Sequence, residues 1–86
     1  MTLRELAEFT QTQIEVLYPD TDGNWYAHLT HVEVREPGML ASVSGRGKTC
    51  EEALTDYCKR IAGQPLVARA MQNNRIQFAA PRDLQP

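Results

Sequence analysis

The feature that most constrains the fold is the eleven-residue stretch from Ser44 to Leu54, where a glycine-rich segment runs into the start of a helix. Thr49 followed three residues later by Glu52 is a helix capping-box pattern, in which a hydroxyl and a carboxylate bond free backbone N–H groups. Gly45 and Gly47 permit a left-handed backbone or the close approach of another group. We therefore expect a strand, a glycine loop and a helix in direct succession.

Two cations flank this expected helix start. The N-terminal end of a helix dipole is positive and attracts anions, and Arg46 and Lys48 add to that charge. We predict a phosphate-holding segment made by Arg46, Gly47, Lys48 and Thr49, while a purely structural turn with a capping threonine remains the alternative. A nucleotide-hydrolysing P-loop is excluded, because Ser42 stands where the motif requires its first glycine.

The remaining pattern predicts one α+β domain over residues 1–86, with an antiparallel sheet that carries one main helix on one face, in the order α-β-β-β-α-β-β. A phase slip of the apolar residues near Thr30 and His31 predicts a bulge in the second strand. The expected elements are a short helix over 2–10, strands over 14–18, 25–36 and 39–43, the main helix over 48–62, and strands over 66–70 and 76–80. Turn residues fill 19–24, the core spans 13–80, and a polar tail covers 81–86.

Charge and cysteine content narrow the partners. Nine Lys and Arg against eleven Asp and Glu give a formal net charge of −2, so nucleic acid and membranes are not expected partners. No signal-peptide pattern and no long apolar run is present, which favours the cytoplasm. Cys50 and Cys58 would lie roughly 12 Å apart on the helix, too far for a disulfide, so we expect buried free thiols.

Aromatic, amide and guanidinium groups provide further candidates for ligand binding. Trp25 and Tyr26 must point to opposite faces of a strand, so one packs in the core while the other lies at an oligomer interface or stacks on a base. The expected turn near residues 72–75 offers amides and a cation that could read a nucleotide, although such residues are also common in turns. These additional candidates are Arg69, Asn73, Asn74 and Arg75.

No catalytic constellation emerges from the sequence. His28 and His31 have no evident orienting acid, and capping explains most carboxylates, so we predict that the protein is not an enzyme. The two cysteines and two histidines do not have the spacing of a zinc site, and we expect neither a metal nor a cofactor.

The central strand-loop-helix portion has parallels in known families. Double-stranded RNA-binding domains share a β-β-β-α run, and HicB-type antitoxins also share a helix entry like Thr49 to Ala53. Over residues 14–81 the chain resembles the Thoeris anti-defence sponges of phages and prophages. The resemblance lies in Trp25 to Ala27, Gly45 to Leu54, Tyr57, Ile61 to Gly63, Leu66-Val67, Arg75 and Pro81.

The resemblance to the sponges implies a non-enzymatic protein that sequesters a cyclic nucleotide signal and so blocks host antiphage defence. The implied ligand is glycocyclic ADP-ribose, and some members are also implied to hold cyclic oligonucleotides. It further implies a homo-oligomer, from dimer to hexamer, in the host bacterial cytoplasm. The ten candidate residues above are chosen on physical grounds and are not carried over from the family. The alternative function is a double-stranded RNA-binding or HicB-like antitoxin module.

Overall fold

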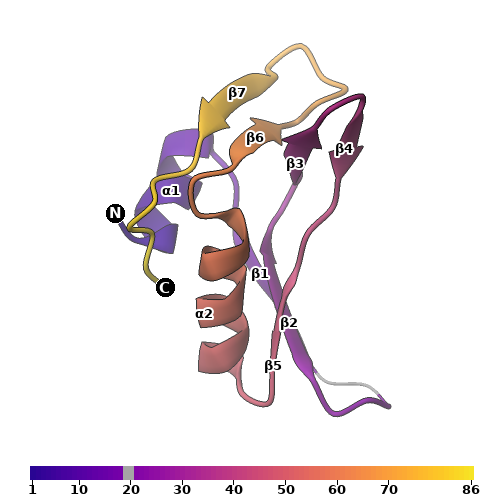
Figure 1. Cartoon of the computed structure of the whole chain (residues 1–86), viewed down its shortest axis with the longest axis vertical. Helices are drawn as coiled ribbons and strands as arrows, with labels where there is room; N and C mark the ends of the chain where they lie inside the picture. The colour runs from indigo at the N-terminus through magenta and orange to yellow at the C-terminus, as the bar shows by residue number, and fades with distance from the viewer. Residues whose placement is uncertain (19–20) are drawn as a thin grey trace.

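A computed structural model describes residues 1–18 and 21–86, so Pro19 and Asp20 of the predicted 19–24 turn lie outside the described residues. The α+β class is confirmed, and Figure 1 shows the main helix lying along one side of the strands. The elements are α1 (Leu3–Thr10), β1 (Ile14–Leu17), β2 (Trp25–Leu29), β3 (Val32–Glu36), β4 (Met39–Ala41), β5 (Gly45–Gly47), α2 (Cys50–Ile61), β6 (Pro65–Ala68) and β7 (Ile76–Ala79).

The strands form two small antiparallel sheets rather than one. The first has the order β1-β2-β5 and the second the order β4-β3-β6-β7. The prediction of a single strand over 25–36 is wrong, because the chain turns at Thr30-His31 and passes from one sheet to the other. His31 adopts a left-handed φ of 60°, and this turn replaces the predicted bulge.

The register explains why the sheet divides. Ala27 pairs with Gly45 in the first sheet, and Val34 pairs with Ala41 in the second. Seven residue steps separate 27 from 34 but only four separate 41 from 45, so three extra residues on one side prevent a continuous ladder. The predicted strand over 39–43 therefore ends at Ala41, and pairing resumes in β5.

The glycines of the predicted loop belong to β5 and lie against α2. A Cβ on Gly45 would come within 2.2 Å of the Ala53 carbonyl oxygen and 2.3 Å of the Tyr57 backbone nitrogen. A Cβ on Gly47 would come within 2.4 Å of the Glu52 Cβ. Close approach is thus the role of both glycines, and the group that approaches is the helix of the same chain. The prediction of a loop here is wrong because the strand must run directly beneath α2.

The core is formed by α1, α2 and the two sheets. α2 buries Ala53, Tyr57, Cys58 and Ile61, while Cys50 at its start is only partly buried. The capping box predicted at Thr49 forms only in part: the Thr49 hydroxyl accepts from the Glu52 N–H (3.1 Å), but the Glu52 carboxylate accepts from the Lys48 N–H (2.9 Å) and not from the Thr49 N–H. The left-handed Gly63 (φ 73°) then ends the helix region as predicted.

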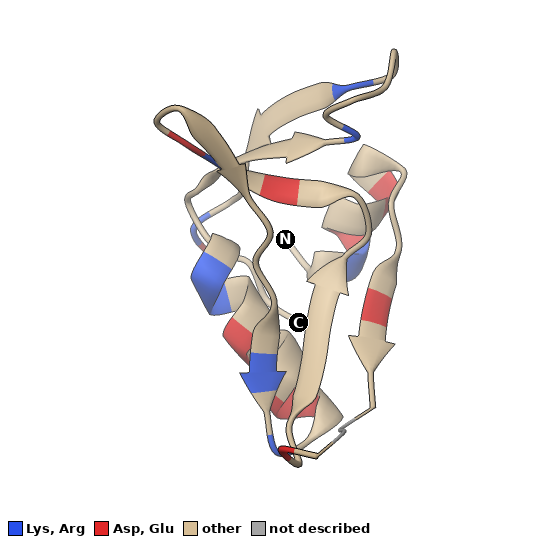
Figure 2. Ribbon diagram, turned by 90° about the vertical axis from the view of Figure 1, so that its right-hand side faces the viewer, with Lys and Arg blue, Asp and Glu red and all other residues tan. Residues whose placement is uncertain are grey.

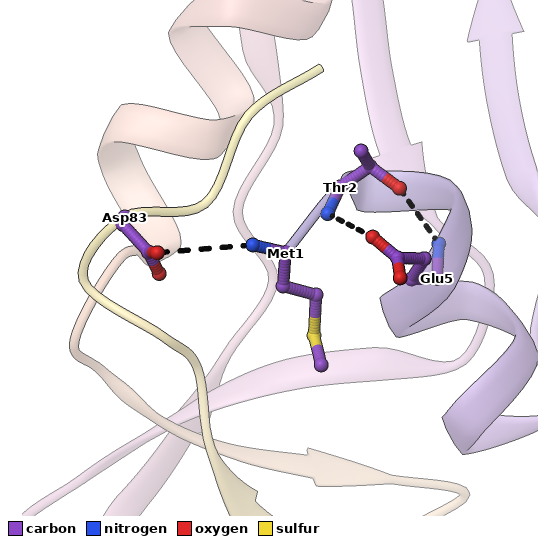
Figure 3. Close-up of polar contacts among 4 residues, drawn as sticks. All are labelled: Met1, Thr2, Glu5 and Asp83. Atoms are coloured by element: carbon purple, nitrogen blue, oxygen red, sulfur yellow. Dashed lines mark hydrogen bonds and ion pairs between the residues drawn. The ribbon is translucent and has the colours of Figure 1, made fainter.

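The two ends of the chain meet beside α1. Figure 3 shows the complete capping box of α1, in which the Thr2 N–H donates to the Glu5 carboxylate (2.9 Å) and the Glu5 N–H to the Thr2 hydroxyl (3.1 Å). The Met1 ammonium lies 3.8 Å from the Asp83 carboxylate. Leu84 is buried and the Gln85 carbonyl accepts from the Leu3 N–H (2.7 Å), so the tail is fastened to the core.

Candidate functional site

A surface hollow of about 550 Å³ lies between β5 and the first turns of α2. Three of the predicted binding residues, Arg46, Gly47 and Lys48, line it from the strand side. Thr49 stands at the same end and caps the helix. The other lining residues, which the sequence reasoning did not select, are Asn24, Glu51, Glu52, Thr55, Asp56 and Lys59.

The backbone N–H groups along the outer edge of β5 are already bonded to carboxylates of α2. The Arg46 N–H donates to Asp56 (2.8 Å), and the Lys48 N–H donates to Glu52 (2.9 Å). Asp56 also accepts from the Arg60 guanidinium (2.7 Å), and this bond is the main cause that lowers the pKa of Asp56 below its ordinary value. An anion in the hollow must therefore be held by side-chain cations rather than by these N–H groups.

The hollow carries both signs of charge. Arg46, Lys48 and Lys59 contribute three cations, and Figure 2 shows the strand and helix charges on adjoining elements. Glu51, Glu52 and Asp56 contribute three carboxylates, two of which are engaged by the backbone of β5. Such a lining suits a ligand that combines phosphate with hydroxyl groups, because the cations bind the phosphate and the carboxylates accept from the hydroxyls.

The sequence contained a signal for the missed residues. Positions 52, 55, 56 and 59 recur at three- and four-residue intervals, which places them on one face of a helix. Only the tertiary structure shows that this face borders β5.

Trp25 and Tyr26 point to opposite faces of the first sheet. Trp25 pairs with Gly47 on the side that faces α2, is partly buried against the core, and meets Tyr18 edge to face at 4.9 Å. Tyr26 pairs with Arg46 on the side away from α2. Its hydroxyl donates to the Asp22 carboxylate, which raises the pKa of Tyr26 and lowers that of Asp22. Neither ring lines the hollow.

Four other candidates lie at the opposite end of the molecule. Figure 1 shows the segment between β6 and β7 at one end of the long axis and the start of α2 at the other. Asn73, Asn74 and Arg75 are exposed in that segment. Within one chain, the structure therefore does not bring them together with Arg46 and Lys48.

Arg69 is committed to the fold. It is buried, with a left-handed φ of 54°, and its guanidinium donates to the carbonyls of Thr10 (2.6 Å), Gln11 (3.3 Å) and Asn74 (3.2 Å). These carbonyls include the last turn of α1, where a cation also meets the negative end of the helix dipole. We leave Arg69 out of the proposed site because it is buried and its Nε and Nη1 already donate to carbonyls within the chain.

His28 has the orienting acid that the sequence did not reveal. Its Nε2 lies 3.0 Å from the Glu15 carboxylate, since Glu15 and His28 are paired across β1 and β2. Its Nδ1 is buried and has no hydrogen-bond partner in the described part of the chain. A second hollow, of about 390 Å³, lies beside it where the two sheets separate, and Ser42, Ser44 and Glu33 are among its lining residues. Within residues 1–18 and 21–86, no hydrogen bond joins the His28 Nδ1 to either serine.

Comparisons with known proteins add no relative. No protein-family model, curated protein or solved structure matches the chain. Within residues 1–18 and 21–86, no helix is long and apolar enough to cross a membrane. In the same residues, no three histidine, cysteine or acidic side chains gather in a way that could hold a metal ion.

Proposed function

We propose that this protein is a non-enzymatic binder that sequesters a small nucleotide in the hollow between β5 and α2. The observation that carries the proposal is the pairing of three cations with carboxylate acceptors around a space of about 550 Å³. This volume falls in the range of small-molecule sites, about 300 to 1,000 Å³. A diphosphate linked to ribose presents both the anionic oxygens and the hydroxyl donors that such a lining binds.

The resemblance to the Thoeris anti-defence sponges makes a cyclic ADP-ribose isomer the first ligand to test, with cyclic oligonucleotides second. Under this proposal the protein acts in the host bacterial cytoplasm and keeps the signal from its effector. A homo-oligomer would let Asn73, Asn74 and Arg75 of one copy approach the hollow of another.

The test is calorimetric titration of the purified protein with glycocyclic ADP-ribose, followed by heat denaturation and mass spectrometry of the released small molecule. Arg46→Ala and Lys48→Ala should each weaken binding by about 1.5 to 3 kcal/mol, the range for a hydrogen bond to a charged group. Arg35→Ala is the matched control, because its guanidinium bonds Gln77 in the other sheet (2.9 Å). Release of the intact nucleotide supports sequestration, whereas a hydrolysed product would identify an enzyme.

The double-stranded RNA-binding or HicB-like antitoxin function has weaker support. Backbone binding needs several uncompensated cations, whereas the hollow matches its three cations with three carboxylates and the whole chain has a net charge of −2. A gel-shift series with duplex RNA at rising salt separates the two functions. Tight binding that falls steeply with salt would favour the RNA module and count against the nucleotide sponge.

A further inference from the structure

The outer edge of β1 is the least protected strand edge in the described part of the molecule. Figure 2 shows β1 at one side of its sheet, with β2 between it and β5. The segment from Ile14 to Tyr18 exposes three large apolar side chains: Ile14 (37%), Leu17 (48%) and Tyr18 (78%). An open edge with such side chains is a template for pairing with another strand.

The other edge strands have features that hinder pairing with another chain. The outward N–H of Arg46 in β5 is bonded by Asp56, and that of Lys48 directly after β5 is bonded by Glu52. β4 has only three residues and follows the Pro37-Gly38 turn. The apolar side chains of β7, Ile76 and Phe78, are partly buried. In β1 only Val16 is partly buried against the core, and its four residues include neither proline nor lysine.

We propose that β1 pairs antiparallel with β1 of a second copy of this chain, about a two-fold axis at Val16. The pairing joins three strands from each copy into one six-stranded sheet in the order β5-β2-β1-β1-β2-β5, with α2 on the same face in both. It is an isologous contact, which closes at a dimer. The pairing does not require a nucleotide, so it can hold or fail independently of the proposed function.

The sequence of β1 selects both the partner and the register. If α2 lies on the same face of the joined sheet in both copies, residues that oppose each other across the two β1 strands must point to the same face. The two-fold axis must therefore pass midway between the two copies of a single residue. An axis at Glu15 would oppose two carboxylates, and an axis at Leu17 would leave Ile14 and Glu15 without a described residue opposite. An axis at Val16 opposes Val16 to itself, Glu15 to Leu17 and Ile14 to Tyr18. Val16 then meets its own copy and Ile14 meets Tyr18 on one face, while Leu17 lies opposite Glu15 on the other face and the two carboxylates are kept apart.

Charge at position 17 tests this register. In the proposed dimer each residue 17 lies opposite Glu15 of the other copy. Because the two copies are identical, every substitution changes two such contacts. Leu17→Glu should raise the dimer Kd by about 100-fold or more, whereas Leu17→Lys, which forms two cross-strand ion pairs, should stay within about tenfold of the unsubstituted chain. Met39→Glu is the control, since Met39 is similarly exposed (59%) on the edge of the other sheet.

Light scattering after size-exclusion chromatography gives the readout, with circular dichroism to confirm folding. The unsubstituted chain should reach twice its 9.7 kDa monomer mass. A monomer at concentrations up to about 1 mM, where even a very weak complex forms, would overturn the proposal. So would equal dissociation by Leu17→Glu and Leu17→Lys, or dissociation by Met39→Glu alone.

Oxidative cross-linking provides a second measurement that tolerates a weak dimer. In a Cys50→Ser background, Val16→Cys places two thiols directly opposite each other, at a Cβ separation of about 4.5 to 5.5 Å, from which a small shift forms a disulfide. Leu17→Cys places them on the diagonal, about 7 to 8 Å apart, which is too far. A covalent dimer from Val16→Cys but not from Leu17→Cys is expected, and the reverse result would refute the register.

Discussion

Replacing Gly45 by alanine tests whether β5 must carry a glycine to lie beneath α2. The added Cβ would fall 2.2 Å from the Ala53 oxygen, 2.3 Å from the Tyr57 nitrogen and 2.5 Å from the Tyr57 Cβ. Two of these are backbone atoms within the helix, so no side-chain rotation can relieve the clash. Either α2 moves away from the strand or β5 leaves the sheet.

The expected cost lies at the upper end of overpacking penalties, about 3 kcal/mol. A domain of this length has a total stability of roughly 4 to 13 kcal/mol, so the loss would be a large fraction of it. With an m-value of about 1.5 kcal/mol/M, the urea midpoint should fall by about 2 M. The shift should also break the bond from the Arg46 N–H to Asp56 and so disturb the hollow.

Urea unfolding followed by the fluorescence of Trp25, which pairs with the neighbouring Gly47, measures the change. Ser44→Ala is the control, because Ser44 is exposed and precedes the same strand, and its effect should stay within about 0.5 kcal/mol. If Gly45→Ala destabilised the protein by less than about 1 kcal/mol, the close packing of α2 on β5 would not be the reason for the glycine.

Two other substitutions probe the remaining contacts. Arg69→Met should lower the free energy of unfolding by about 2 to 4 kcal/mol, since the carbonyls of Thr10, Gln11 and Asn74 lose their donor, and an unchanged urea midpoint would contradict its structural role. The Arg60 guanidinium and the Arg46 N–H lower the pKa of Asp56 in the folded protein. The ionised carboxylate therefore stabilises the fold above its unfolded pKa of about 3.9. This stabilisation is lost as the pH falls through the lower pKa of the folded state. Asp56→Asn should therefore reduce the loss of stability below about pH 4, and an unchanged loss in thermal unfolding from pH 7 to 2 would count against this bond.

Local chemistry explains which features the sequence could predict. The Thr2 and Thr49 caps, the apolar period of α2 and the left-handed Gly63 all depend on residues within one or two turns of each other. The α+β class followed from these patterns. The cationic segment at Arg46 to Lys48 was also visible, because charge near a helix start can be read directly from the order of residues.

The division into two sheets, the partners of Arg69 and the carboxylates on the edge of β5 were decided only in the tertiary structure. A phase slip at Thr30-His31 is compatible both with a bulge and with a turn from one sheet into another. The pairing of Ala27 with Gly45 and of Val34 with Ala41 shows that the chain makes the turn. A lone cation in a strand pattern says nothing about carbonyls 58 and 59 residues away. The sequence by itself determined that two glycines flank Arg46 just before a capped helix. Only the tertiary structure showed that these glycines leave room for α2 to pack on β5, because contacts between elements depend on positions that no local pattern encodes.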